Sequence, residues 1–157
     1  MQLSTMIGYS GGFHEGVERI VALEKAGKPQ WAAQNDPRVT RFDRTGKAVA
    51  TWSLKYAQGT RSNPHAIDID RAGLLYVADR ENHRVQVFDG NGKYETQWNN
   101  LHRPSGLYMP PGKFPICYIA ELGPHLPVNL DHPNIGPRIS ILDHTGALLA
   151  SVEATPA

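Results

Sequence analysis

The chain has 157 residues, about one domain's worth, with 16 basic and 15 acidic side chains and a net charge of +1. That balance argues against a nucleic-acid or membrane partner held mainly by electrostatic attraction. The opening residues, MQLSTMIGYSGG, lack the basic head and long apolar stretch of a secretory signal. No run approaches the roughly 18 apolar residues of a membrane-spanning helix. We therefore expect a soluble, cytoplasmic protein.

Residues 1–37 form an atypical N-terminal segment whose pattern differs from the rest of the chain. Apolar residues between Val17 and Leu23 lie close to helical spacing, and Gly27 supplies a residue that typically ends a helix. The pattern predicts a short helix near residues 15–26.

Three later segments share one pattern: an arginine, a β-branched residue, two variable positions, Phe or Leu, and then Asp-x-x-Gly. They are RVTRFDRTGK from Arg38, RVQVFDGNGK from Arg84 and RISILDHTGA from Arg138. Their apolar residues recur with the two-residue period of a β-strand. The aspartates can open a tight turn and the glycines can adopt the positive φ that closes it, at Asp43–Gly46, Asp89–Gly92 and Asp143–Gly146. A second short run follows each turn, so each segment predicts a β-hairpin.

A second repeat lies upstream of the last two hairpins. PHAIDIDRAGLLYVAD, from Pro64, matches PSGLYMPPGKFPICYIAE, from Pro104, so the units begin 40 residues apart. Each unit reads as four short antiparallel strands, which is typical of propeller arrays. The sequence predicts an all-β fold, a partial β-propeller of about two and a half to three four-stranded blades. We assign residues 38–53 to a partial blade and residues 64–103 and 104–152 to two full blades. The last blade contains a loop insertion at residues 122–137, and residues 153–157 form a tail.

The single cysteine, Cys117, excludes an internal disulfide framework. It lies in the apolar run PICYIAEL, where a buried thiol is chemically inert more often than it is reactive. We therefore predict a structural role for Cys117.

The loop insertion, LGPHLPVNLDHPNIGP, is rich in proline and glycine and reads as a long surface loop. His125, Asp131 and His132 in it could suggest a second metal site, but the nearby prolines and the lack of supporting residues favour a solvated loop. His83 and His102 lie in loops between strands and receive no role.

The stretch PHAIDIDRAGLLYVADRENHRVQVFD resembles the NHL repeat of six-bladed β-propellers. Within that group, residues 38–152 are most similar to bacterial propellers of the peptidyl-α-hydroxyglycine amidating lyase type. In those lyases a Pro-His pair at the start of an innermost strand supplies a zinc ligand, which the resemblance places at His65. The arginine of their V-A-D-R-E-N segment is catalytic, which corresponds to Arg80. The position of their catalytic tyrosine holds Gln34, in AAQNDPR.

His65 and Arg80 also form a coherent pair in physical terms. Innermost strands line the channel of a propeller, so His65 would offer a neutral imidazole to a zinc ion on the axis. Arg80 closes the second strand of the same unit, where its permanent cation could hold a carboxylate or an oxyanion. The alternative is structural: His65 hydrogen-bonds a neighbouring loop, and Arg80 pairs with Glu81 or Asp79.

The number of zinc ligands in the chain limits this chemistry. A catalytic zinc takes about three protein ligands, which in a six-bladed ring come from every second blade. Ser105 and Leu122 stand where His65 and Arg80 stand in the preceding unit, so the chain supplies one histidine of the three. The blades with the other ligands would lie one before and one after this piece.

These features leave one enzyme and two non-catalytic alternatives. The enzyme would be a zinc-assisted lyase that cleaves a small peptide-like substrate, peptidyl-α-hydroxyglycine, to a peptide amide and glyoxylate. His65 would be its metal ligand and Arg80 its catalytic anion clamp. The alternatives are an NHL scaffold that binds a protein or another copy of itself, and a truncated product with no function of its own. The ligand count predicts absent or very low lyase activity in the isolated chain.

The open faces of an incomplete array predict a partner. A blade of four strands about 4.8 Å apart, each about five residues long, presents a face of roughly 320 Å². Two such faces together exceed the apolar patch of a typical soluble monomer. We expect a homodimer that completes a six-bladed ring. A partner chain, or residues 1–37 folded over one face, would be the other ways to cover them.

Overall fold

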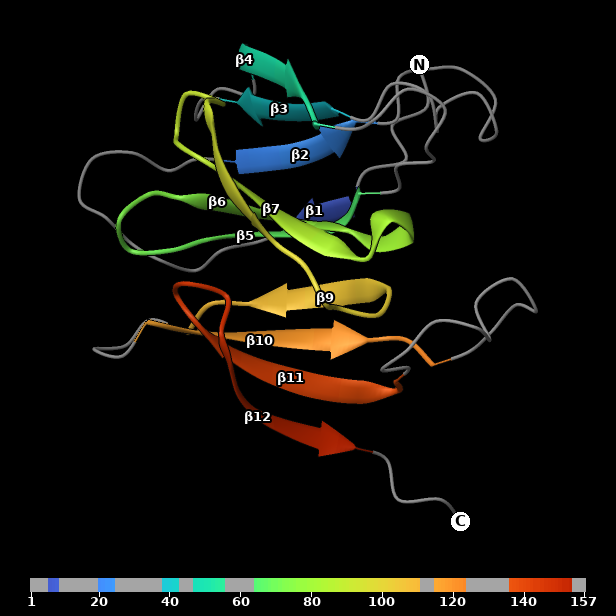
Figure 1. Cartoon of the computed structure of the whole chain (residues 1–157). Coiled ribbons are helices and arrows are strands. Elements are labelled where there is room, and N and C mark those ends of the chain that lie inside the picture. Colours follow the sequence, from blue (N-terminus) through green and yellow to red (C-terminus); the bar gives the residue numbers. More distant parts are fainter. Residues whose placement is uncertain are drawn as a thin grey trace.

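Three four-stranded antiparallel sheets make up the protein. The structure, a computed structural model, describes residues 6–8, 20–24, 38–42, 47–55, 64–110, 115–123 and 136–153. In each sheet every strand pairs with its neighbour along the chain, in the orders β1-β2-β3-β4, β5-β6-β7-β8 and β9-β10-β11-β12. Figure 1 shows the sheets one above another. The predicted all-β, propeller-type fold is confirmed.

Each sheet is one blade. The first blade consists of β1 (Met6–Gly8), β2 (Ile20–Glu24), β3 (Arg38–Phe42) and β4 (Ala48–Ser53). The second consists of β5 (Pro64–Ile69), β6 (Leu75–Asp79), β7 (Arg84–Phe88) and β8 (Tyr94–Trp98), with a 3₁₀ turn, η2 (Arg80–Asn82), between β6 and β7. The third consists of β9 (Pro104–Tyr108), β10 (Ile116–Glu121), β11 (Arg138–Asp143) and β12 (Leu148–Glu153).

The helix predicted near residues 15–26 is wrong where the structure describes that segment. Residues Ile20–Glu24 form β2, which pairs with β3 from Ile20↔Phe42 to Glu24↔Arg38. A short apolar run fits a strand as well as a helix, and backbone pairing with β3 decides between them. With β1 beside β2, the sheet that contains residues 38–53 has four strands.

The turns of the second and third hairpins are confirmed. Gly92 and Gly146 have φ values of 86° and 87°, a conformation that favours glycine because it has no Cβ. Their amides donate to the carbonyl oxygens of Asp89 and Asp143, at 3.1 and 3.0 Å. Backbone hydrogen bonds from Lys93 and Asn91 lower the pKa of the Asp89 carboxyl. The aspartate therefore organises the turn that the glycine closes.

The blades pack face to face through two apolar clusters. The junction of the first and second blades contains Val39, Leu54, Ile67, Leu75, Val77 and Phe88, with Trp52 against it. The junction of the second and third contains Tyr76, Val85, Val87, Trp98, Leu101, Cys117, Ile119 and Leu142. In both junctions the tryptophan that ends a blade lies over the turn glycine of the next, where a Cβ would overlap its ring. This pattern repeats from junction to junction.

Some predicted features lie outside the described residues. They are the Asp43–Gly46 turn, Gln34, and the middle of the loop insertion with His125, Asp131 and His132. In the ranges that the structure describes, no helix is long and apolar enough to cross a membrane.

Candidate functional site

His65 lies near the start of β5, the first strand of the second blade. The β5–β6 register shifts between Pro64 and Ala66, so His65 occupies an irregularity of the strand. Its Nδ1 lies 2.7 Å from the carbonyl oxygen of Ser105, the corresponding residue of the third blade. Because a carbonyl oxygen can only accept, Nδ1 is the donor, which in the neutral imidazole leaves Nε2 with its lone pair. The contact is a structural one, as in the alternative reading, but its partner lies in strand β9 and not in a loop.

Arg80 is the first residue of η2 and follows β6 directly. Its Nε donates to Oε1 of Glu81 at 2.7 Å, and its side chain is 20% exposed. Nη2 of Arg103 reaches the same oxygen at 3.3 Å. Burial works to raise the pKa of Glu81, but the hydrogen bond and charge of Arg80 and the charge of Arg103 outweigh it, so the pKa is lowered. Two guanidinium groups share one carboxylate, which leaves this corner with excess positive charge.

Sequence reasoning missed Arg103. It lies in the link between the second and third blades and adopts a φ of 46°. Its backbone amide donates to Nδ1 of His83 at 3.3 Å, and the rings of His83 and His102 lie 5.1 Å apart. Arg103 and Glu81 are 22 residues apart in the sequence, and no local sequence pattern predicts their contact. Only the folded link brings the two together.

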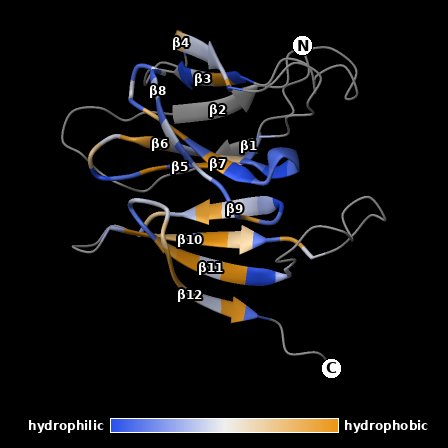
Figure 2. Ribbon diagram, in the orientation of Figure 1, coloured by the Kyte–Doolittle hydropathy of each residue, from blue (hydrophilic) through white to orange (hydrophobic). Residues whose placement is uncertain are grey.

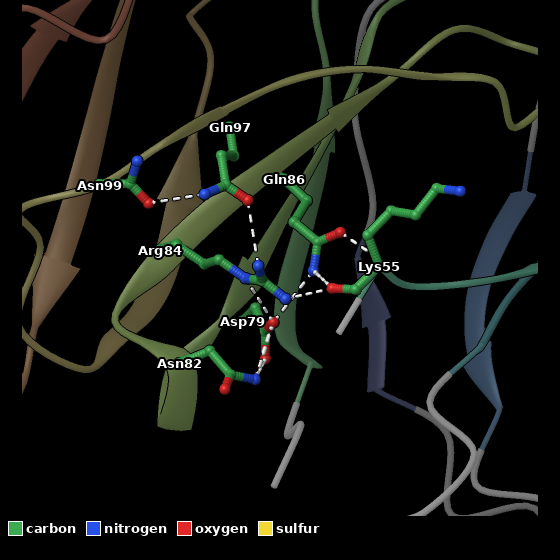
Figure 3. Close-up of polar contacts among 7 residues, drawn as sticks. All are labelled: Lys55, Asp79, Asn82, Arg84, Gln86, Gln97 and Asn99. Atoms are coloured by element: carbon green, nitrogen blue, oxygen red, sulfur yellow. Dashed lines mark hydrogen bonds and ion pairs between the residues drawn. The ribbon is translucent and has the colours of Figure 1, made fainter. Parts of the chain in front are cut away.

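Asp79, at the end of β6, is fully buried in a separate network, which Figure 3 shows. Oδ2 accepts from Nε of Arg84 at 2.9 Å and from Nε2 of Gln86 at 3.0 Å. Gln86 in turn holds both backbone groups of Lys55, at 2.9 and 2.8 Å, and so ties down the chain that leaves the first blade. Asp79 therefore has an architectural role.

The third blade repeats this network. Glu121, which corresponds to Asp79, receives two hydrogen bonds of 3.0 Å from Arg138. It also accepts from the backbone amide of His102, at 2.5 Å, in the link that leaves the second blade. Each acidic residue thus anchors the segment that arrives from the preceding blade.

The described residues do not make up a zinc site. Within them there is no group of three His, Cys, Asp or Glu side chains that could hold a metal ion. Ser105 and Leu122 occupy the positions in the third blade that His65 and Arg80 occupy in the second. His65 is suited to be one ligand, but no reaction step through zinc follows from the residues described.

Comparisons with known proteins agree with the repeat. Residues 62–88 match the family model of the NHL repeat. A 64-residue stretch is 41% identical to human NHL repeat-containing protein 3, and the match covers 38% of this chain and 18% of that protein. The mouse protein of the same name is 38% identical over 64 residues. The match therefore spans less than a fifth of these curated relatives.

Solved structures share the fold. Hydrazine synthase from Kuenenia stuttgartiensis aligns with a TM-score of 0.61 and 19% identity over 94% of this chain and 40% of its own. Virginiamycin B lyase from Staphylococcus aureus aligns with a TM-score of 0.56 and 13% identity over 88% of this chain and 39% of its own. At these identities the likeness concerns the fold alone.

Proposed function

We propose that this chain, which carries an NHL repeat in an array of propeller blades, is a segment related to the metal-dependent amidating lyases and does not cleave peptidyl-α-hydroxyglycine on its own. The hydrogen bond from His65 Nδ1 to the Ser105 carbonyl oxygen, at 2.7 Å, carries this proposal. It leaves Nε2 as the electron-pair donor, as in metal-bound histidines. One histidine is nonetheless one ligand where a catalytic zinc takes about three.

Arg80 supports the same proposal because its side chain is suited to bind the substrate. Glu81 holds its Nε at 2.7 Å, which restrains the plane of the guanidinium group. Among the described residues, neither Nη atom of Arg80 has a hydrogen-bond or ion-pair partner. A guanidinium with two free Nη atoms can bind a carboxylate. Arg80 is therefore the residue that would hold the anionic end of a glycine-like substrate.

A non-catalytic scaffold for protein binding or self-association is the second candidate. The distribution of exposed apolar residues favours it. Most of the large hydrophobic residues that are exposed in the described part of the chain lie on the third blade, namely Tyr108, Ile139, Leu148, Leu149 and Val152. Ile139 and Val152 are directly paired and so share one side of the sheet, and exposed apolar patches mark interaction surfaces.

Glyoxylate release from peptidyl-α-hydroxyglycine tests the lyase proposal. We expect no release above the uncatalysed rate from the purified, zinc-supplemented chain, and less than one zinc per chain by elemental analysis. His65→Ala should leave both values unchanged, as should the control His144→Ala, which replaces an exposed histidine. Zinc-dependent turnover that His65→Ala abolishes and His144→Ala preserves would overturn the proposal and identify a self-contained enzyme.

A further inference from the structure

We infer that the exposed side of the third blade is a docking face for the first blade of a second copy of this chain. Each blade has two faces. The face that packs against the next blade along the chain is called its outgoing face, and the face that packs against the preceding blade is called its entering face. The inference makes the self-association named above specific. It fails separately from the lyase proposal, because its test measures mass and not turnover.

The outgoing faces of the second and third blades are both apolar, but the first of them is buried and the other is exposed. In the second blade this face consists of Tyr76, Val85, Val87 and Trp98, which are 0–3% exposed beneath the third blade. The corresponding residues of the third blade are Tyr118, Ile139, Ile141 and Val152. Ile139 is 46% exposed and Val152 is 60% exposed. A surface built like a blade junction is therefore open.

The strand register places these residues on one face. Tyr118 pairs with Ile141, and Ile139 pairs with Val152, just as Tyr76 pairs with Val87 and Val85 with Trp98. Directly paired residues of neighbouring strands point to the same side of a sheet. The neighbouring positions on this side, Gly106, Ala120 and Ala150, are small and uncharged. Figure 2 shows hydrophobic colours along β10, β11 and β12.

The first blade carries the pattern of an entering face. In the second blade, Leu75, Val77 and Phe88 fill this role, and in the third Cys117, Ile119 and Leu142 do so. The same register positions in the first blade are Ile20, Ala22 and Phe42, with Ile20 paired to Phe42 as Leu75 is to Phe88. A second copy thus offers, in its first blade, the sequence pattern that the open outgoing face needs.

The area fits a stable pair. Each blade face is roughly 320 Å². In a closed pair the third blade of each copy meets the first blade of the other, so two identical junctions bury four faces, roughly 1,300 Å² in total. That lies within the range of standard-size protein interfaces. Two copies of three blades would then form one ring related by a two-fold axis.

Sedimentation equilibrium across the micromolar range tests this inference. We expect a mass of two chains, each of 17.3 kDa. Val152→Arg and Ile139→Arg should each weaken association by roughly 100-fold or more, because each buries an unpaired charge in an apolar junction. Both residues are exposed within one chain, so the melting temperature of the monomer should be preserved.

Val49→Arg is the matched control. Val49 is also exposed, at 47%, but its counterpart in the second blade is Glu95, which stays exposed although that blade has neighbours on both sides. The position therefore lies outside the blade junctions, and the substitution should leave the mass unchanged. A monomer at every concentration, assemblies larger than two chains, or a dimer that Val152→Arg and Ile139→Arg leave intact would each overturn the inference.

Discussion

The Glu81 carboxylate joins two guanidinium groups from different parts of the fold, Arg80 from η2 and Arg103 from the link to the third blade. Nε and Nη1 of Arg103 are buried and have no hydrogen-bond partner among the described residues, so the ion pair of Nη2 with Glu81 compensates for the burial of this cation. Loss of one partner of a buried ion pair costs more than the pair contributes, because the remaining charge stays buried. Glu81 therefore stabilises the corner that carries Arg80.

Replacement of Glu81 should change how stability depends on pH. The folded-state pKa of Glu81 lies below its ordinary value of 4.5, so its contribution is present above pH 4.5 and is lost as pH falls through the lowered pKa. Glu81→Gln should destabilise the protein by about 1–2 kcal/mol at neutral pH, and the difference from wild type should shrink in acid. Urea unfolding at neutral and acid pH measures it.

The exposed Lys93–Glu95 pair supplies the control for this experiment. Glu95→Gln should change stability by less than about 1 kcal/mol at either pH, because exposed ion pairs contribute little. A Glu81→Gln variant that matches wild type at neutral pH would show that the Arg80–Glu81–Arg103 contacts do not stabilise the fold.

Cys117 illustrates what sequence can predict at this scale. Its apolar surroundings predicted a buried, inert thiol, and it is fully buried in the second junction. Burial, together with the charge of Asp68, raises the pKa of the thiol to about 12. The partners of Arg80 were harder to predict, because Glu81 and Asp79 both flank it closely and the choice depends on the 3₁₀ turn. Arg103, which completes the corner, is distant in sequence.

At the scale of elements, hairpins were easier to predict than the strands before them. A hairpin brings its own signals, alternation and an Asp-x-x-Gly turn, and these placed β7, β8, β11 and β12 correctly. β2 carries only a short apolar run, and its strand character comes from pairing with β3, which begins 14 residues after β2 ends. Local spacing therefore favoured a helix there, and tertiary pairing overrode it.

Gly92 links turn geometry to blade packing, and its replacement should expose both. Gly92→Val should destabilise the protein by about 1–3 kcal/mol from backbone strain at positive φ, with a further loss because its Cβ overlaps the Trp52 ring. In a Trp52→Ala background the strain should remain and the overlap should disappear. Thermal or urea unfolding of the four chains of this double-mutant cycle separates the two effects. An unchanged melting curve for Gly92→Val would contradict the turn assignment.

The acidic residues at the ends of β6 and β10 anchor backbone that arrives from the preceding blade. Asp79 and Glu121 each hold, directly or through Gln86, the backbone of the link from the preceding blade. The sequence shows each acidic residue and the arginine that follows it, Arg84 or Arg138. It does not show which backbone segment of the preceding blade they bind. That backbone is recognised only through the stacking of blades, which is why the sequence did not predict it.

At the scale of the whole molecule, the repeat period determines which residues meet. His65 and Ser105 are 40 positions apart and in hydrogen-bond contact, as are Asp68 and Met109, 41 positions apart. Sequence comparison of the units predicted that Ser105 corresponds to His65, and the fold shows that these two residues of adjacent blades touch. Among the residues that the structure describes, no three His, Cys, Asp or Glu side chains lie together as a zinc site would require.

Native mass spectrometry of the zinc-supplemented chain tests this account most directly, because one spectrum reports the number of chains and the metal they retain. We predict a complex of two chains, each of 17.3 kDa, without one tightly retained zinc per chain. A stable single chain that retains one zinc and loses it in His65→Ala would contradict both the paired ring and the incomplete site.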